Sequence, residues 1–357
     1  PQLRTSTGRI AAYHDGMRVW LGARDWTAPD GTTWEHKFAY TEQGNNLEDV
    51  FTMEFKTVCR FPEPQVLVDL LPSQRLETEC DEIDPSMGPA RKIVMVVNTN
   101  LGVTMRKEIL AFSQEHHDDY HIIDFTLTNT GNVDGDEEIE LDQTINDLYL
   151  WWDRRLGQTT QTRDVIGRGA TWGDWNYQDV VRDADLKTYI SWQGWSPELQ
   201  DWNPIGAPAF DSEGSSFVAG RDTSGQLHAI GFVGVGHVRA DVSAEDDSDD
   251  PVQPRTMWWL GANAANATGS PPDDFNKETM RQHYEDWMQA GVVQPTMADT
   301  LCPDGDYAHC TANPDITSGG RRIALGYGPY TLEPGESVNI VMTEAVSGLT
   351  YEAGRVI

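Results

Sequence analysis

The chain has 357 residues, a formal net charge of −31 and a sequence pI near 4.4. A surface of this sign repels phosphate, which excludes nucleic acid and anionic membranes as natural partners and leaves cations as the expected counterparts. No apolar run approaches the roughly 18–20 residues that a membrane-spanning helix needs, so we expect no transmembrane segment.

Both ends of the chain suggest a processed protein. The start at Pro1 lacks the form of a signal peptide, and the chain stops on apolar residues at Ile357. We therefore expect further sequence beyond Ile357. The acidity fits a salt-rich habitat, and it fits equally a secreted protein that stays dispersed through its net charge.

Alternation of apolar and polar residues recurs along the chain, whereas helical periodicity is rare. Turn-forming segments such as Asn100–Gly102 and Pro334–Gly335 separate many of the alternating runs. The sequence therefore predicts a mainly β protein, built as a large antiparallel β-sandwich. The predicted strands are Arg18–Ala23, Asp49–Phe55, Lys92–Asn98, Val103–Phe112, Tyr120–Asn129, Glu137–Asp142, Leu148–Asp153, Thr188–Trp192, Leu227–Val235, Arg255–Leu260, Arg322–Tyr327 and Ser337–Ala345.

Four cysteines, an even number, favour two disulfides in an oxidising compartment. Local pairing predicts one bridge between Cys59 and Cys80 and a second across the loop from Cys302 to Cys310. Zinc bound by cysteines and His309 is the competing interpretation, but no Cys-x2-Cys spacing supports it. The absence of Cys-x-x-Cys-His excludes covalently attached haem.

The segment Glu115–His121 offers a transition-metal hypothesis. On a strand, alternation places His117, Asp119 and His121 on one face, which gives two imidazoles and one carboxylate. The same residues are also typical of a hairpin turn, in which these side chains would not share one face.

Oxygen ligands at alternate positions around a glycine suggest a calcium loop, without the distal glutamate of an EF-hand. These ligands are Asn132, Asp134, Asp136 and Glu138. Asp304 and Asp306 form a second candidate cluster. We expect calcium to neutralise and stiffen such loops, and solvated acidic turns are the alternative.

Tryptophan is concentrated between Trp151 and Trp202, which contain seven of the 13 in the chain. Indole stacks on sugar rings, so this region suggests a glycan-binding groove. Packing in a core or in a subunit interface is the alternative. The candidate glycan contacts are Trp172, Trp175, Trp192, Trp195 and Trp202.

One segment is predicted to be helical. Residues 273–290 begin with acidic N-cap candidates and carry Met280, Tyr284 and Trp287 on one stripe, and Gly291 follows the end. We expect this amphipathic helix to pack on a sheet.

Two segments resemble elements of secreted bacterial surface proteins. Tyr120–Asn132, which contains Asn-Thr-Gly-Asn, resembles a strand and turn of immunoglobulin-like modules. Gly328–Val341, which contains Leu-Glu-Pro-Gly-Glu-Ser, resembles their returning strand. The resemblance implies an extracellular or cell-surface location.

About two hundred residues separate these two elements, so the implied sandwich is discontinuous or resembles the supersandwich of carbohydrate enzymes. We predict a first part in residues 1–150, a Trp-rich insertion with the helix in 151–320, and return strands in 321–357.

No catalytic motif appears in the sequence. There is no Gly-x-Ser-x-Gly, no His-Glu-x-x-His and no phosphate loop, so the chain identifies neither a reaction nor a nucleotide cofactor. The sequence favours a structural or adhesive surface protein, stabilised by cations, with copies of itself or other surface proteins as partners. A carbohydrate-binding or carbohydrate-active protein, with glycan as partner, is the alternative.

Overall fold

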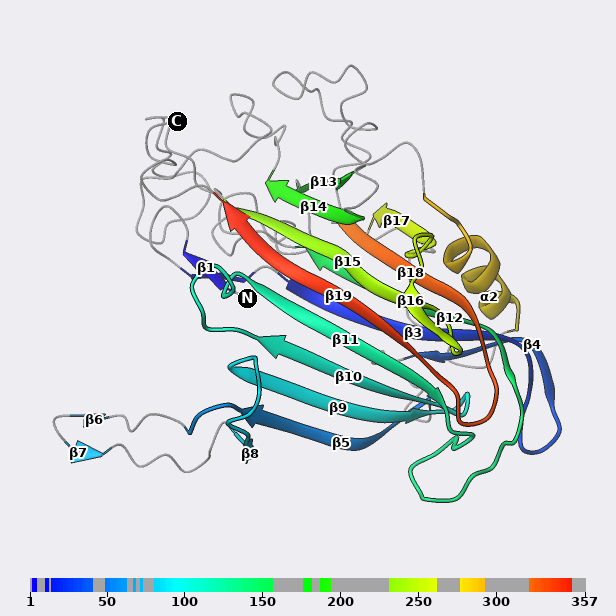
Figure 1. Ribbon diagram of the computed structural model, residues 1–357. Coiled ribbons are helices and arrows are strands. Elements are labelled where there is room, and N and C mark those ends of the chain that lie inside the picture. The colour runs from blue at the N-terminus through cyan, green and yellow to red at the C-terminus, as the bar shows by residue number, and fades with distance from the viewer. Residues whose placement is uncertain are drawn as a thin grey trace, which may run out of the picture.

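The computed structural model describes residues 2–4, 10–12, 14–40, 49–62, 67–68, 71–72, 80–156, 176–181, 187–193, 231–261, 277–292 and 321–348. At some strand ends it describes the backbone alone. This part of the chain forms a mainly β protein with two large sheets packed face to face, which confirms the predicted β-sandwich (Figure 1).

The larger sheet has ten strands, and all neighbouring pairs except one are antiparallel. Nine of its strands follow the order β13-β14-β15-β19-β11-β10-β9-β5-β8, and β16 pairs with β15. The strands are β5 (Val50–Cys59), β8 (Glu82–Ile83), β9 (Arg91–Thr99), β10 (Val103–Ala111), β11 (Tyr120–Asn129), β13 (Asn176–Val181), β14 (Thr188–Gln193), β15 (Gly231–Ser243), β16 (Asp246–Asp249) and β19 (Ser337–Gly348).

The smaller sheet has five strands in the order β17-β18-β12-β3-β4. They are β3 (His14–Thr27), β4 (Thr33–Tyr40), β12 (Ile145–Leu156), β17 (Thr256–Gly261) and β18 (Arg321–Leu332). Two short hairpins complete the described strands: β1 (Gln2–Arg4) with β2 (Ile10–Ala12), and β6 (Leu67–Val68) with β7 (Leu71–Pro72).

The main core lies between the two sheets. Alternation along each strand sends one set of side chains inward, for example Leu150 and Trp152 from β12 and Phe125 from β11, all fully buried. Strands from early and late parts of the chain meet here, because β19 pairs with β11 and β18 pairs with β12. The resulting sandwich joins segments that are distant in sequence.

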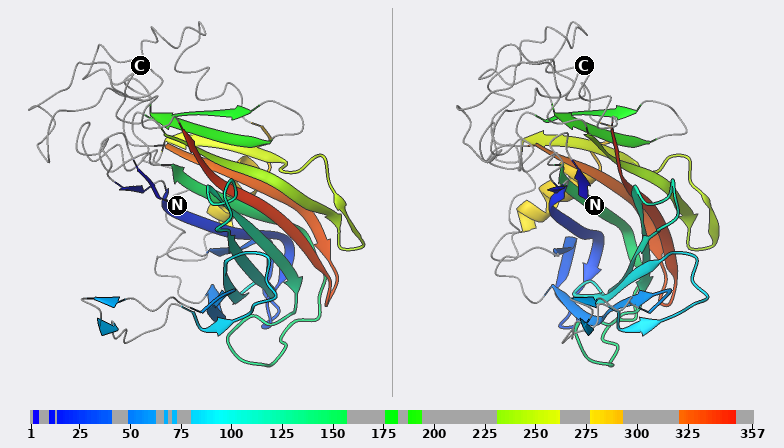
Figure 2. Two further views of the ribbon diagram at one scale, coloured as in Figure 1. Left: turned by 60° about the vertical axis from the view of Figure 1, so that its left-hand side comes forward. Right: turned by 90° about the vertical axis from the view of Figure 1, so that its left-hand side faces the viewer.

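A second core lies on the other face of the five-stranded sheet, under the helix α2 (Lys277–Gln282) and the π-helical turn η2 (His283–Met288) (Figure 2). The predicted stripe of Met280, Tyr284 and Trp287 is buried against the sheet, as expected. Gly22 allows this close approach, since a Cβ there would meet Met288 Sδ at 2.9 Å.

Among the elements where the structure differs from the prediction, two have a clear physical reason. The predicted strand Glu137–Asp142 is a loop, because Gly131 O accepts the Leu141 amide and the Glu140 side chain accepts the Val133 amide. The strand β4 was not predicted, because both of its faces are buried and its polar Lys37 is covered by Trp26 and Trp34. The sequence of β4 therefore shows no alternation of apolar and polar residues.

Cys59 and Cys80 form the predicted disulfide. Cys302 and Cys310 lie outside the described residues. Among the described helices, none has the length and apolar character that crossing a membrane requires.

Candidate functional site

The strand β5 lies at one edge of the ten-stranded sheet, opposite the edge formed by β13 (Figure 1). Its inner neighbour is β9. Among the described strands, its outer neighbour is the two-residue β8, which pairs only with Val58 and Cys59. The disulfide to Cys80 fastens this end of β5, and the stretch before Val58 has no described strand on its outer side.

Large apolar side chains gather at this edge in exposed positions. Phe55 is 67% exposed, and the others are Phe61 at 62%, Met53 at 43% and Ile83 at 42%. We name these four residues the edge patch. A register shift between Thr52 and Glu54 places Met53 in a bulge, which adds local twist to the edge.

The edge patch continues the inner face of the sheet. Phe55 is paired across the strands with Met95, which packs against the inter-sheet core, and directly paired residues point to the same face. Ile83 is paired in the same way with Cys59, two pleats further along β5. The inner face therefore ends at this edge in an exposed phenyl ring.

The opposite face of the same strands carries a ladder of ion pairs. Lys56 contacts Glu54 at 3.0 Å and Glu82 at 3.2 Å, and both contacts raise the pKa of Lys56. Arg106 and Lys92 extend the ladder through Glu108, at 2.5 Å and 3.4 Å. Such exposed pairs contribute little stability. Their three basic and three acidic groups nevertheless leave this ladder neutral in a strongly acidic chain.

The predicted calcium loop is a run of side-chain-stabilised turns. Asn132 Oδ1 accepts the Asp134 amide at 3.0 Å, Asp134 Oδ1 accepts the Asp136 amide at 2.9 Å, and Asp136 Oδ1 accepts the Glu138 amide at 2.8 Å. The structure brings Asp134 and Asp136 together with Glu140, whose oxygens all lie within 4.8 Å of one another. Glu140 was missed because it lay inside a predicted strand, and Glu138 is not part of this cluster.

The residues of the histidine hypothesis do not form one cluster. His117 and Asp119 lie in the turn between β10 and β11, where His116 has a φ of 71°, and His121 is the second residue of β11. His117 Nδ1 lies 2.7 Å from the Tyr120 hydroxyl. This segment is therefore a turn, as the alternative to the metal site supposed.

Two tryptophans of the Trp-rich region belong to the cores. Trp152 lies between the sheets and Trp151 under the helix, both fully buried. Trp192 is in β14, and only its backbone is described. The remaining candidates lie outside the described residues: Trp172, Trp175, Trp195, Trp202, Asp304 and Asp306. The glycan hypothesis stays a prediction.

A cluster of buried and partly buried ionisable side chains lies beside the inter-sheet core. Lys107 is 3% exposed, and burial, reinforced by the charge of Arg154, lowers its pKa to about 8, while Glu344 opposes this shift. Arg154 stacks over Trp152 at 5.1 Å and pairs with Glu344, which is itself paired across the strands with His121. The sequence did not reveal this ionic cluster because four separate strands supply it.

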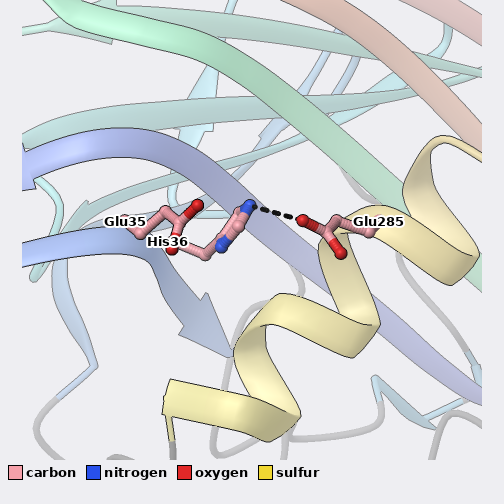
Figure 3. Close-up of side chains that lie close together, drawn as sticks. All are labelled: Glu35, His36 and Glu285. Carbon is pink, nitrogen blue, oxygen red and sulfur yellow. Dashed lines mark ion pairs between the residues drawn. The ribbon is translucent and has the colours of Figure 1, made fainter.

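A further cluster joins β4 to the helix. His36 Nε2 lies 3.8 Å from Glu285 Oε1 in η2, and a Glu35 oxygen lies in the same group within 4.8 Å (Figure 3). The His36 ring is buried, and burial lowers its pKa, which Glu285 and Glu35 oppose. Sequence reasoning missed the cluster because β4 was not predicted and Glu285 lies far along the chain.

Comparison with known proteins finds no family model that matches the chain and no significantly similar curated protein. The functional proposal therefore rests on the geometry and on the sequence.

Proposed function

We propose that the protein is a secreted or cell-surface structural protein whose copies join through the edge patch on β5. The observation that carries the proposal is an edge strand of a large sheet that presents Met53 and Phe55 to solvent. Exposed apolar edges are sites of strand pairing between chains, and natural proteins otherwise cover or charge them.

The charges around the edge patch support a second copy of the chain as the partner. Two copies that each carry a formal charge of −31 repel one another over most of their surfaces. The ion-pair ladder from Glu54 to Glu108 is neutral, so β5 approaches another copy without this penalty. Burial of a phenyl ring such as that of Phe55 contributes roughly 2 kcal/mol on each side of an interface.

Calcium forms the second part of the proposal. The oxygens of Asp134, Asp136 and Glu140 are of the kind that calcium binds, and the turns already direct them to one place. The Asn98 side chain donates to Asp134 O, which ties this loop to β9. A bound cation would stiffen the loop beside the outer face of the sheet.

The test replaces Phe55 with glutamate and measures the mass in solution by light scattering over a range of concentrations. We expect the wild-type chain to form oligomers and Phe55→Glu to stay monomeric, because a charge at the centre of the interface opposes its burial. The matched control is Ile139→Glu, since Ile139 is 70% exposed in a loop outside the edge patch. A wild-type chain that is monomeric at every concentration contradicts the proposal, as does equal assembly of both variants.

A further inference from the structure

We propose that Glu35, His36 and Glu285 form a binding site for a divalent first-row transition metal ion that links β4 to the turn η2. This inference is independent of assembly through the edge patch. Three features of the cluster carry it: a buried imidazole whose Nε2 faces a carboxylate, the spacing of the ligand atoms, and the way that Glu285 is held.

The imidazole of His36 is the first feature. The residue is 4% exposed, and its ring lies against that of Tyr284 with the ring centroids 4.8 Å apart. Its Nε2 points toward Glu285 Oε1 across 3.8 Å, which is too long for a hydrogen bond (Figure 3). A metal ion between these two atoms would bind both of them.

The spacing of the ligand atoms is the second feature. Zinc binds nitrogen and oxygen at about 2.0–2.2 Å, so tetrahedral ligands lie roughly 3.4 Å apart. The distance between His36 Nε2 and Glu285 Oε1 exceeds this by only a few tenths of an ångström. A Glu35 oxygen lies within 4.8 Å of one ligand atom of His36 and one of Glu285, and rotation of its exposed side chain can shorten these distances.

The way that Glu285 is held is the third feature. Its Oε2 pairs with Arg281, which also pairs with Glu278, so Oε1 is left to face His36. Such a second contact orients the carboxylate of a metal ligand. Arg24 is the other basic group that acts on His36, and its Nη1 lies 3.6 Å from Asp147.

The ligand types define the ion. One imidazole and two carboxylates suit zinc and its first-row neighbours, whereas calcium and magnesium prefer oxygen ligands alone. Two of the three side chains are exposed, which leaves an open side for water or another ligand. The ion would fasten the helix to the sheet at a π-helical turn, a feature that often marks functional sites.

The experiment titrates zinc chloride into the metal-free full chain by calorimetry. We expect His36→Gln and Glu285→Gln each to lose one bound equivalent, or to weaken it at least tenfold, relative to the wild type. The control is Asp286→Asn, which removes a carboxylate charge from the same turn outside the cluster and should bind as the wild type does. Unchanged binding in His36→Gln and Glu285→Gln overturns the proposal.

A second measurement needs no variant. Crystals of the wild-type chain soaked with zinc should show an anomalous peak between His36 Nε2 and the two carboxylates. Peaks confined to other positions overturn the proposal even if the variants fail to fold. At a hundredfold excess of zinc over its Kd, we also expect the unfolding temperature to rise by about 5 °C.

Discussion

Two features of its turn require glycine at position 131: a positive φ and the lack of room for a Cβ atom. Its φ is +72°, and a Cβ on this residue would meet the Leu141 carbonyl oxygen at 2.0 Å. The backbone hydrogen bond between the two residues prevents Leu141 from moving away. We expect Gly131→Ala to lower the free energy of unfolding by about 3 kcal/mol, measured by urea denaturation.

Gly31 is the matched control for this prediction. It also has a positive φ, of 84°, but no atom lies within 4 Å of a Cβ placed there. Gly31→Ala should therefore lose only the conformational part, about 1 kcal/mol. Equal losses in the two variants would show that the contact with Leu141 has no influence.

His237 makes stability depend on pH. Its side chain is 9% exposed, its ring contacts Tyr327, and burial lowers its pKa while Asp249 opposes the shift. The unfolded chain therefore binds this proton more tightly than the folded chain does. The stabilising contribution is complete above the unfolded pKa of about 6.5 and is lost as the pH falls toward the folded value.

The measurement is the free energy of unfolding between about pH 7 and pH 5. The wild type should lose stability over this range, and His237→Gln should lose less. An unchanged slope in His237→Gln would contradict this explanation.

The predicted calcium loop should make the stability of the protein depend on calcium. Calcium should raise the unfolding temperature of the wild type, and Asp134→Asn should abolish the rise, because a charged oxygen of the cluster is lost. Asp30 supplies the control, since it accepts the Thr32 amide in a similar turn but belongs to no cluster found among the described residues. A calcium response that persists in Asp134→Asn would argue against the site.

The sequence predicts best those elements that have one face buried. The strand β11 matches its predicted bounds from Tyr120 to Asn129, because buried and partly exposed side chains alternate along most of it. The strand β4 was missed because burial on both faces, including that of Lys37, removes the alternation. Alternation at Glu137–Asp142 was misleading, because turn contacts from Gly131 and Glu140 determine that loop.

Sites were predictable only where their residues are neighbours in sequence. Asp134 and Asp136 were found from spacing, whereas His36 and Glu285 meet only because η2 packs over β4. The ionic cluster around Lys107 likewise depends on the meeting of β10, β11, β12 and β19. Pairing between distant strands cannot be read from local patterns.

The surface of the whole molecule is uneven in charge and in polarity. The chain is strongly acidic, most of its buried apolar residues lie in two cores, and one edge of the larger sheet exposes Phe55 beside a neutral ladder of ion pairs. A protein that only needed to stay dispersed would place charges there. We therefore assign the edge patch to contact between copies.

Hydrogen exchange of the backbone amides of β5 tests this claim most directly. The account predicts that amides between Val50 and Lys56 that are unprotected in the dilute chain become protected when the chain is concentrated enough to assemble, while those of the turn at His116 and His117 do not change. Assembly without added protection in β5, or no assembly at any concentration, would contradict the account.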